Sequence, residues 1–191
     1  MDDINIAIKK LDQYACHKLT SARYLHSVLV AKESIVLAKK FGVDHKKAYL
    51  AGIAHDIARE FSNTRILKLA DKYQLEIDNL QRLYPASLLH GPIASKILEY
   101  DFSIKDSQIL NAVFYHTTGS PNMERFEKII CVADYIEPSR NFTGVGKLRN
   151  LAYKDLDLCL YHCLLGTYYH LKKQGLNPHK LLVDTITQLK Q

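Results

Sequence analysis

The sequence contains few cysteines, no extended apolar segment and no region rich in glycine, serine or proline. No stretch approaches the ~20 consecutive apolar residues that a helix needs to cross a bilayer, which argues against a membrane protein. The alternation of apolar and polar residues that is typical of a half-buried strand is also absent over any useful length. Without linkers or internal repeats, the 191 residues fit one domain, which is long enough to bury a core without disulfides.

The four cysteines show no CxxC spacing, and this argues against a structural zinc site. Cys159 and Cys163 lie one helical turn apart in the apolar run LDLCLYHCLL. A structural zinc ion usually needs four suitable ligands at closer spacing. We therefore interpret both residues as small buried hydrophobes rather than as a pair of metal ligands.

A long basic run is absent too, although the formal net charge is +6. The lysines come in pairs, such as Lys39-Lys40 and Lys172-Lys173, which are typical of solvated helix ends. A nucleic-acid partner is thus not indicated, whereas a small phosphate-bearing substrate fits the charge. The N-terminus, MDDINIAIKK, lacks the basic start and apolar centre of a signal peptide, so we expect a cytoplasmic protein.

Helical periodicity dominates the chain and predicts an all-α fold of about nine or ten helices. Residues 22–40 form one such segment, with an apolar stripe that includes Leu25, Val28, Leu29 and Val36. Asp44 is suited to cap a helix running through Arg59, Ser62 or Asn63 the next one, and Asp106 a helix ending near residue 115.

The second half of the chain carries similar signals. Ser120-Pro121 predicts the start of a helix that stops before Pro138. A long helix is expected over residues 155–173, and Asn177-Pro178 should open the last one. Residues 137–150, EPSRNFTGVGKLRN, have no clear helical punctuation, and a loop of that length is usually functional.

Acids and histidines interrupt several of the apolar helical faces. A lone histidine on such a face is more often a hydrogen-bonded core residue than a metal ligand, and each site by itself has that simple explanation. Together, however, these polar groups would each need a separate buried partner. The residues concerned are His26, His55, Asp56, His90, His116 and Asp134.

One shared cluster of divalent metal ions would satisfy all six side chains at once. Imidazole and carboxylate ligands suit iron, manganese, cobalt or zinc better than magnesium or calcium. Six protein ligands exceed the need of one catalytic ion with an open position, so we expect two metals bridged by Asp56. Such a pair would bind the phosphoryl oxygens of a substrate and activate a bridging hydroxide.

The other histidines lie in less suggestive places. His17, His45 and His179 have polar neighbours and are expected at the surface. His162 and His170 lie two turns apart on the long helix, where we expect a core or surface role rather than metal binding.

The order H…HD…H…H…D in an all-helical chain resembles the HD-domain phosphohydrolase superfamily. The segments RYLHSVLVAKESIVLAKKFGVD, AGIAHDIARE, LLHGPIAS, YHTTG and ADYIEPSRNFTGVGKLRNLA are similar to the YqeK family within it. The resemblance implies a single HD domain over residues 1–191, with a metal-site core at about 20–152 and C-terminal helices at 153–191 packed on it.

The resemblance also implies an activity. Members of the YqeK family hydrolyse diadenosine tetraphosphate symmetrically to two ADP and are associated with a di-iron centre, whose ligands would be the six residues above. Many superfamily members have a lysine three positions after the HD pair, where this chain has Arg59. An arginine can bind two phosphate oxygens but cannot donate a proton at neutral pH. We therefore expect Asp56 and Arg59 in the catalytic centre, with Arg59 binding phosphate or forming a structural ion pair.

Further substrate contacts are expected from the segment after Asp134 and from a hydroxyl beside His116. The candidates are Arg140, Lys147, Arg149 and Thr117. The alternatives are another HD-domain nucleotide phosphohydrolase or phosphodiesterase, or a non-catalytic HD protein that binds nucleotides or RNA. A small-molecule nucleotide is the expected partner, and a homodimer is compatible with the sequence.

Overall fold

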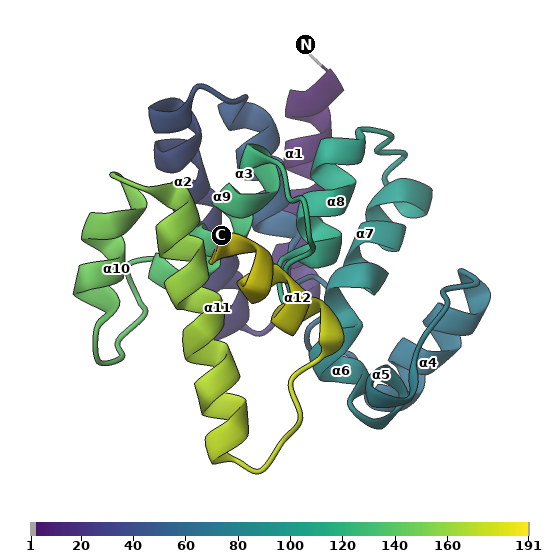
Figure 1. Cartoon of the computed structure of the whole chain (residues 1–191). Helices are drawn as coiled ribbons and strands as arrows, with labels where there is room; N and C mark the ends of the chain where they lie inside the picture. Colours follow the sequence, from purple (N-terminus) through teal and green to yellow (C-terminus); the bar gives the residue numbers. More distant parts are fainter. Residues whose placement is uncertain (1–2, 191) are drawn as a thin grey trace.

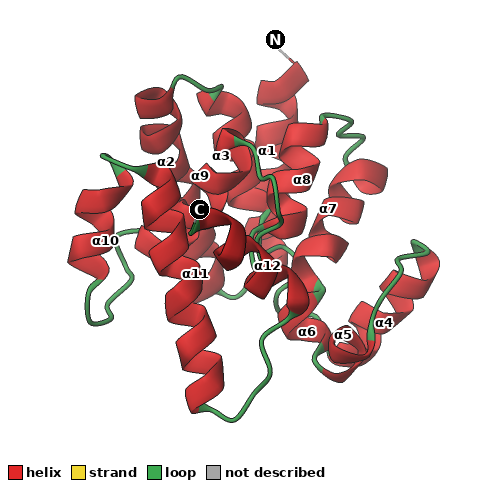
Figure 2. Ribbon diagram, in the orientation of Figure 1, coloured by secondary structure: helices red, strands yellow, loops and turns green. Residues whose placement is uncertain are grey.

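A computed structural model describes residues 3–190, which form twelve helices and no strand (Figures 1 and 2). The predicted all-α fold is therefore confirmed, but the expected nine or ten helices were too few. The helices are α1 (Asp3–Lys18), α2 (Ser21–Phe41), α3 (His45–Ala54), α4 (Asn63–Lys72), α5 (Asn79–Leu83), α6 (Pro85–Leu88), α7 (His90–Asp101), α8 (Ser107–Tyr115), α9 (Arg125–Ile136), α10 (Val145–Ala152), α11 (Leu156–Lys173) and α12 (Lys180–Leu189).

The closest helix packing joins α2 and α3, and small residues make it possible. A Cβ on Gly52 of α3 would lie only 2.6 Å from the Cα of Ala31 on α2. The buried face of α2 combines small and polar residues, such as Ser27, Ala31 and Ser34, with Val30 and Leu37. The predicted apolar stripe was wrong in part: Leu25 and Val36 are 56% and 47% exposed, whereas Val28 and Leu29 are half-buried.

A second close contact joins α7 and α8. A Cβ on Gly91 would lie 2.9 Å from the carbonyl oxygens of Val113 and Phe114 and 3.1 Å from the His116 ring. Gly91 thus lets the first turn of α7 approach the last turn of α8. Each close contact brings two candidate ligands together, since His26 and His55 lie beside the first and His90 and His116 beside the second.

The helix boundaries follow most of the predicted caps. Asp44, Ser62 and Asp106 each accept a hydrogen bond from backbone N–H groups of the helix that follows. The helix after Asp44 nevertheless ends at Ala54, and residues 55–60 form turns rather than continuing the helix. This early end leaves His55 and Asp56 in an irregular segment whose side chains can point to the same side.

The segment before α9 was predicted incorrectly. Pro121 and Asn122 form a turn in which Asn122 adopts a φ of +63°. The helix begins only at Arg125, where Glu124 and Glu127 form a reciprocal capping box. Two glutamates whose carboxylates each accept the backbone N–H of the other make a stronger start signal than the Ser-Pro pair.

The expected long loop at 137–150 is only partly irregular, because α10 covers its second half. Gly144, with a φ of +96°, precedes that helix. α11 confirms the long helix and is followed by Gly175 at a φ of +73°. The last helix starts at Lys180 rather than at Asn177-Pro178. Its cap is His179, which is buried and not at the surface as predicted.

The remaining elements enclose the site. α11 contacts α9, α10 and α12, while α4, α5 and α6 lie together beside α7 (Figure 1). Cys159 and Cys163 of α11 are free and buried in the core, as predicted. Among the described residues, no helix is both long and apolar enough to span a membrane.

Candidate metal centre

The six predicted ligands lie together where five segments meet. His26 comes from α2, His55 and Asp56 from the turn after α3, and Asp134 from α9. His90 is the first residue of α7, and His116 directly follows α8. All four histidines and Asp56 are at most 8% exposed, so these polar groups lie inside the fold.

Asp56 lies at the centre of this cluster. Its Oδ2 is 3.5 Å from Nε2 of His55 and 3.8 Å from Nε2 of His26. Its Oδ1 is 3.4 Å from Nε2 of His90 and 3.8 Å from Nε2 of His116. The two carboxylate oxygens thus face two different histidine pairs.

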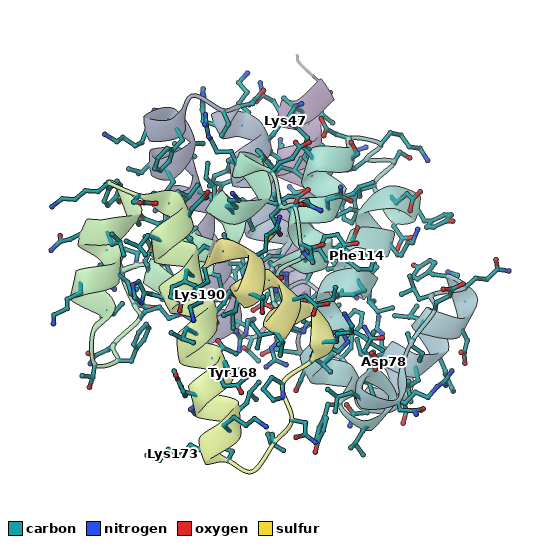
Figure 3. The ribbon with its side chains drawn as sticks, viewed as in Figure 1. Lys47, Asp78, Phe114, Tyr168, Lys173 and Lys190 are labelled. Atoms are coloured by element: carbon teal, nitrogen blue, oxygen red, sulfur yellow. The ribbon has the colours of Figure 1, made fainter. Side chains whose placement is uncertain are left out.

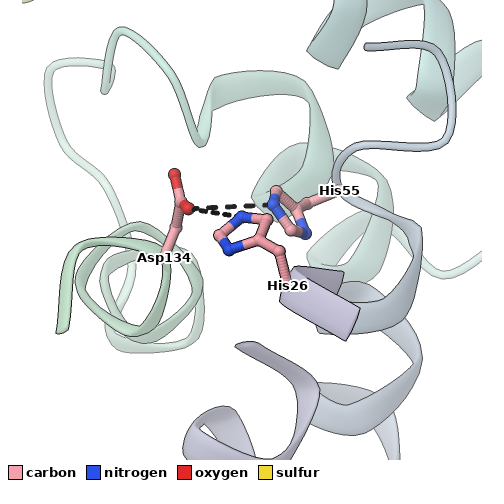
Figure 4. Close-up of side chains that lie close together, drawn as sticks. All are labelled: His26, His55 and Asp134. Carbon is pink, nitrogen blue, oxygen red and sulfur yellow. Dashed lines mark ion pairs between the residues drawn. The ribbon is translucent and has the colours of Figure 1, made fainter. Parts of the chain in front are cut away.

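Asp134 approaches only one of the two pairs. Its Oδ1 is 3.0 Å from Nε2 of His26 and 3.9 Å from Nε2 of His55, as the dashed lines in Figure 4 show. His26, His55 and Asp134 therefore form one set that could hold a metal ion. His55, Asp56 and His116 form a second set that shares His55 with the first.

Hydrogen bonds fix which nitrogen of each imidazole faces the cluster. Nδ1 of His55, His90 and His116 lies 2.7–2.9 Å from the backbone carbonyl oxygens of Gly52, Ala86 and Val113. A carbonyl oxygen only accepts, so each Nδ1 carries a hydrogen and each Nε2 of a neutral ring offers its lone pair. Nδ1 of His26 lies 3.1 Å from a carboxylate oxygen of Glu137.

Two of the Nε2 atoms lack the hydrogen-bond partners that buried nitrogens normally have. Those of His26 and His55 are buried without a hydrogen bond, and those of His90 and His116 lie 3.1 Å from each other and from the Thr117 hydroxyl. Orphaned buried nitrogens that converge on carboxylates fit a metal ion, because a cation would satisfy them all. The donor set thus has the chemistry that a divalent metal requires.

The charges in the cluster support the same assignment. Burial disfavours ionisation of Asp56, but the adjacent imidazoles of His55, His90 and His116 outweigh it and hold the pKa of Asp56 well below its usual value. Burial, together with the neighbouring His116, lowers the pKa of His90 to about 3. Burial opposes the charged form of His55 as well, but the adjacent Asp56 carboxylate raises its pKa. An ionised Asp56 and a neutral His90 are the protonation states in which these two groups bind a metal.

The cluster opens into a cavity of about 1320 Å³, which is larger than most pockets for small ligands. α11 and α12 contribute to its wall, including His162, His170 and His179. His162 and His170 are solvent-exposed residues on that wall. Four cationic side chains line the cavity: Arg23, Arg59, Arg140 and Lys147.

Three of the predicted substrate contacts lie at the cavity. Lys147 and Arg140 are part of its lining, and Thr117 Oγ1 lies 3.1 Å from Nε2 of both His90 and His116. Arg59 also lines it, and its Nη1 donates to the carbonyl oxygen of Ala86, which also receives His90 Nδ1. Arg59 is therefore anchored beside a candidate ligand.

Arg149 lies elsewhere. Its guanidinium donates to the backbone carbonyl oxygens of Ile136, Glu137 and Arg140, and it is not among the residues that line the cavity. Nε and Nη2 are thus used within the fold, and the geometry does not favour the predicted role of Arg149 in substrate binding.

Two residues at the site were missed by the sequence reasoning. Arg23 lies one helical turn before His26, and its Nη1 donates to Oδ2 of Asp56 at 2.8 Å. The i, i+3 spacing to a candidate ligand was the available signal. Glu137 is fully buried against His26, and its position directly after a helix of candidate ligands was the only hint.

Comparison with known proteins agrees with this geometry. The family model of the HD domain matches residues 23–139. The symmetrical bis(5'-nucleosyl)-tetraphosphatase of Staphylococcus aureus is 35% identical over 94% of this chain and 92% of its own length. That of Bacillus subtilis is 38% identical over 84% of this chain and 87% of its own. The chain belongs to the YqeK family of HD-domain proteins.

A solved structure shares the fold of this YqeK-family chain. It is the crystal structure of a predicted HD superfamily hydrolase involved in NAD metabolism from Clostridium acetobutylicum, with a TM-score of 0.92 and 33% sequence identity. The match covers 95% of this chain and 96% of that one. The HD domain and the histidine–aspartate cluster together identify a divalent-metal site.

Proposed function

We propose that the protein hydrolyses diadenosine tetraphosphate symmetrically, releasing two molecules of ADP, with the help of divalent metal. One observation carries the proposal: the four imidazole Nε2 atoms converge on Asp56 at the wall of a large cavity lined by four cations. The symmetrical tetraphosphatases that match this chain over most of its length support the choice of substrate.

The distances support two metal positions that share Asp56. His26, His55 and Asp134 would hold one ion, and His90 with His116 would hold the other. We propose iron, as the family resemblance implies, and the same donors suit manganese, cobalt or zinc. When bound, such metal lowers the pKa of a water molecule and polarises a phosphoryl oxygen.

The chain's own cations have a separate task. A polyphosphate bridge carries several negative charges, and hydrolysis develops more charge on the equatorial oxygens of the attacked phosphorus. Arg23, Arg140 and Lys147 line the cavity next to the cluster and would bind these oxygens. Arg59 would contribute charge and hydrogen bonds without giving up a proton, and the ADP leaving group needs little protonation because its charge is delocalised.

The proposal extends to location and assembly. All four cysteines are free, and three of them are buried in the core, which supports the predicted cytoplasmic location because that compartment keeps thiols reduced. The homodimer stays a prediction.

The test is product analysis with diadenosine tetraphosphate. Protein purified with and without oxygen is analysed for bound metal and then incubated with the substrate, and the nucleotides are separated by chromatography. We expect ADP as the sole product and about two metal ions per chain. The His90→Ala variant should lose metal and activity together, because it removes a ligand of the second position.

Other results would contradict the proposal at different points. AMP together with ATP would show asymmetric cleavage and overturn the position of the attacked phosphorus. Absence of turnover in metal-replete protein would exclude diadenosine tetraphosphate as the substrate. Full activity of His90→Ala would overturn the two-metal site.

A further inference from the structure

The turn that follows α9, residues Glu137–Arg140, contacts two residues of the cluster. Glu137 is fully buried, and its Oε1 lies 3.1 Å from Nδ1 of His26. The backbone N–H and the hydroxyl of Ser139 donate to the two carboxylate oxygens of Glu137, each at 2.6 Å. These two hydrogen bonds and the His26 ring give the buried carboxylate polar partners on both oxygens.

The other end of the same turn holds Asp134. Nε of Arg140 donates to the backbone carbonyl oxygen of Asp134 at 2.8 Å, and Nη2 of Arg140 donates to its Oδ1. The turn therefore contacts two of the three residues of one candidate metal position, through Glu137 for His26 and through Arg140 for Asp134.

Arg149 holds the turn itself. Its Nε donates to the carbonyl oxygen of Ile136 and its Nη2 to those of Glu137 and Arg140, all at 2.8–2.9 Å. A single guanidinium thus connects α10 to both ends of the turn. Because its donors are used in this way, Arg149 shapes the site without facing the cavity.

We propose that Glu137 is a positioning residue that orients His26 toward the metal, and that Arg149 keeps the turn in the conformation which makes this possible. The proposal rests on the proposed function, since it deepens the account of that same site. His26 is the only one of the four clustered histidines whose Nδ1 meets a carboxylate, because the other three meet carbonyl oxygens. A carboxylate makes the imidazole a more basic ligand, so the position served by His26 should hold its ion more tightly.

The experiment measures metal affinity rather than turnover. The apo proteins are titrated with Mn²⁺ in competition with a chromogenic chelator, and unfolding is followed by circular dichroism. In Glu137→Gln the shape remains but the negative charge is lost, so we expect the dissociation constant for Mn²⁺ to rise about 10–100-fold. Arg149→Met should weaken binding in the same direction, although no atom of Arg149 faces the cavity.

Two matched variants control for loss of charge alone. Asp157→Asn removes an exposed carboxylate that pairs with Lys128 on α9. Arg125→Met removes a guanidinium that donates to the backbone carbonyl oxygen of Phe41. Both should bind Mn²⁺ as the wild type does.

Ser139→Ala is a less disruptive variant that tests the proposal if Glu137→Gln does not fold. Ser139→Ala removes one hydrogen bond to Glu137 at an exposed residue, and we expect the dissociation constant to rise about fivefold. Wild-type affinity in folded Glu137→Gln, or in Ser139→Ala if the former does not fold, would overturn the proposal. So would equal weakening in the two control variants. Failure of the wild type to cleave diadenosine tetraphosphate would contradict only the proposed function, because Mn²⁺ binding is read independently.

Discussion

At the scale of single residues, the position of Asp56 depends on a helix that ends one residue before His55. The turns after Ala54 place His55 and Asp56 side by side with both side chains in the cluster, which a continuous helix would splay by about 100°. Arg23 then reaches Asp56 from α2. A buried carboxylate beside a cation and four imidazoles stays ionised, and that charge is what a metal site needs.

Arg23 provides a prediction at this scale. Arg23→Met should lower kcat/KM about 10–100-fold, because it removes charge-assisted hydrogen bonds from the cavity wall next to the cluster. Steady-state kinetics with diadenosine tetraphosphate measure the effect, and metal analysis checks that both ions remain. Arg125→Met, whose guanidinium lies outside the cavity, is the matched control. Unchanged kinetics in Arg23→Met would contradict a role in binding phosphate.

At the scale of secondary-structure elements, two glycines determine how closely the ligand-bearing helices approach. Gly52 brings α3 against the backbone of α2, and Gly91 brings α7 against the end of α8. Both contacts are with backbone atoms, which cannot rotate away as a flexible side chain could. The spacing of the imidazoles therefore depends on residues that carry no functional group.

The α2–α3 contact can be tested with Gly52→Ala. The added Cβ would lie 2.6 Å from the Cα of Ala31, so the helices must separate, and we expect a loss of about 1–3 kcal/mol of unfolding free energy together with weaker metal binding. Chemical denaturation and chelator competition measure the two effects. Gly146→Ala in α10, where nothing lies within 4 Å of the added Cβ, should not lower stability. Equal stability of the two variants would contradict the argument.

The residue that caps α12, His179, pairs with the residue that caps α5, Asp78. Nε2 of His179 lies 2.9 Å from Oδ2 of Asp78, which is labelled in Figure 3. Nδ1 of His179 accepts the N–H of Leu181, so Nε2 carries the hydrogen that it donates to Asp78. Although partial burial opposes it, the N–H of Gln81 and the His179 ring lower the pKa of Asp78.

The lowered pKa of Asp78 predicts the sign of a pH effect. The ionised carboxylate stabilises the fold at pH values above its unfolded pKa, and this contribution is lost as the pH falls through the folded pKa. Asp78→Asn keeps an oxygen for the α5 cap but loses the charge, so its Tm should be lower than that of the wild type at neutral pH. The difference should disappear as the pH falls through the folded pKa, which lies below the usual value for aspartate. Thermal unfolding at several pH values measures it, and a constant difference would contradict the ion-pair explanation.

At the scale of the whole molecule, the cluster cross-links five segments that are distant in the sequence. Its ligands come from α2, the turn after α3, α7, the end of α8 and α9, and the Nε2 atoms of His26 and His55 are buried without a hydrogen bond. Without metal, these unsatisfied groups lower the free energy of unfolding of the native state. Metal binding is therefore expected to stabilise the entire bundle.

Removal of metal should accordingly lower Tm. An ion present at 100 times its dissociation constant stabilises the native state by about 2.7 kcal/mol, which corresponds to about 5–10 °C in a chain of this size. Calorimetry with and without a chelator measures the shift. His90→Ala should show a smaller shift than the wild type, because one position has lost a ligand. An identical Tm in both conditions would exclude a cross-linking role for the metal.

The sequence alone determined the helical class, most of the caps and the six residues of the cluster. These features are local: a cap is set by a side chain and the next three N–H groups, and a histidine or aspartate on an apolar face is visible without knowing its neighbours. The long α11 and the burial of Cys159 and Cys163 follow from periodicity for the same reason.

The tertiary structure decided which faces and which charges serve the site. Leu25 and Val36 of α2 are exposed, whereas Ala31 lies against Gly52, and no hydropathy pattern records that this contact needs small residues. Arg149 and Arg140 come from the same stretch and look equivalent in the sequence, but one donates to backbone carbonyl oxygens and the other reaches Asp134 at the cavity. His179 is buried by a partner 101 residues away, and Glu137 meets His26 across 111 residues. Contacts between residues so far apart exist only once the chain has packed, so only the folded structure could assign them.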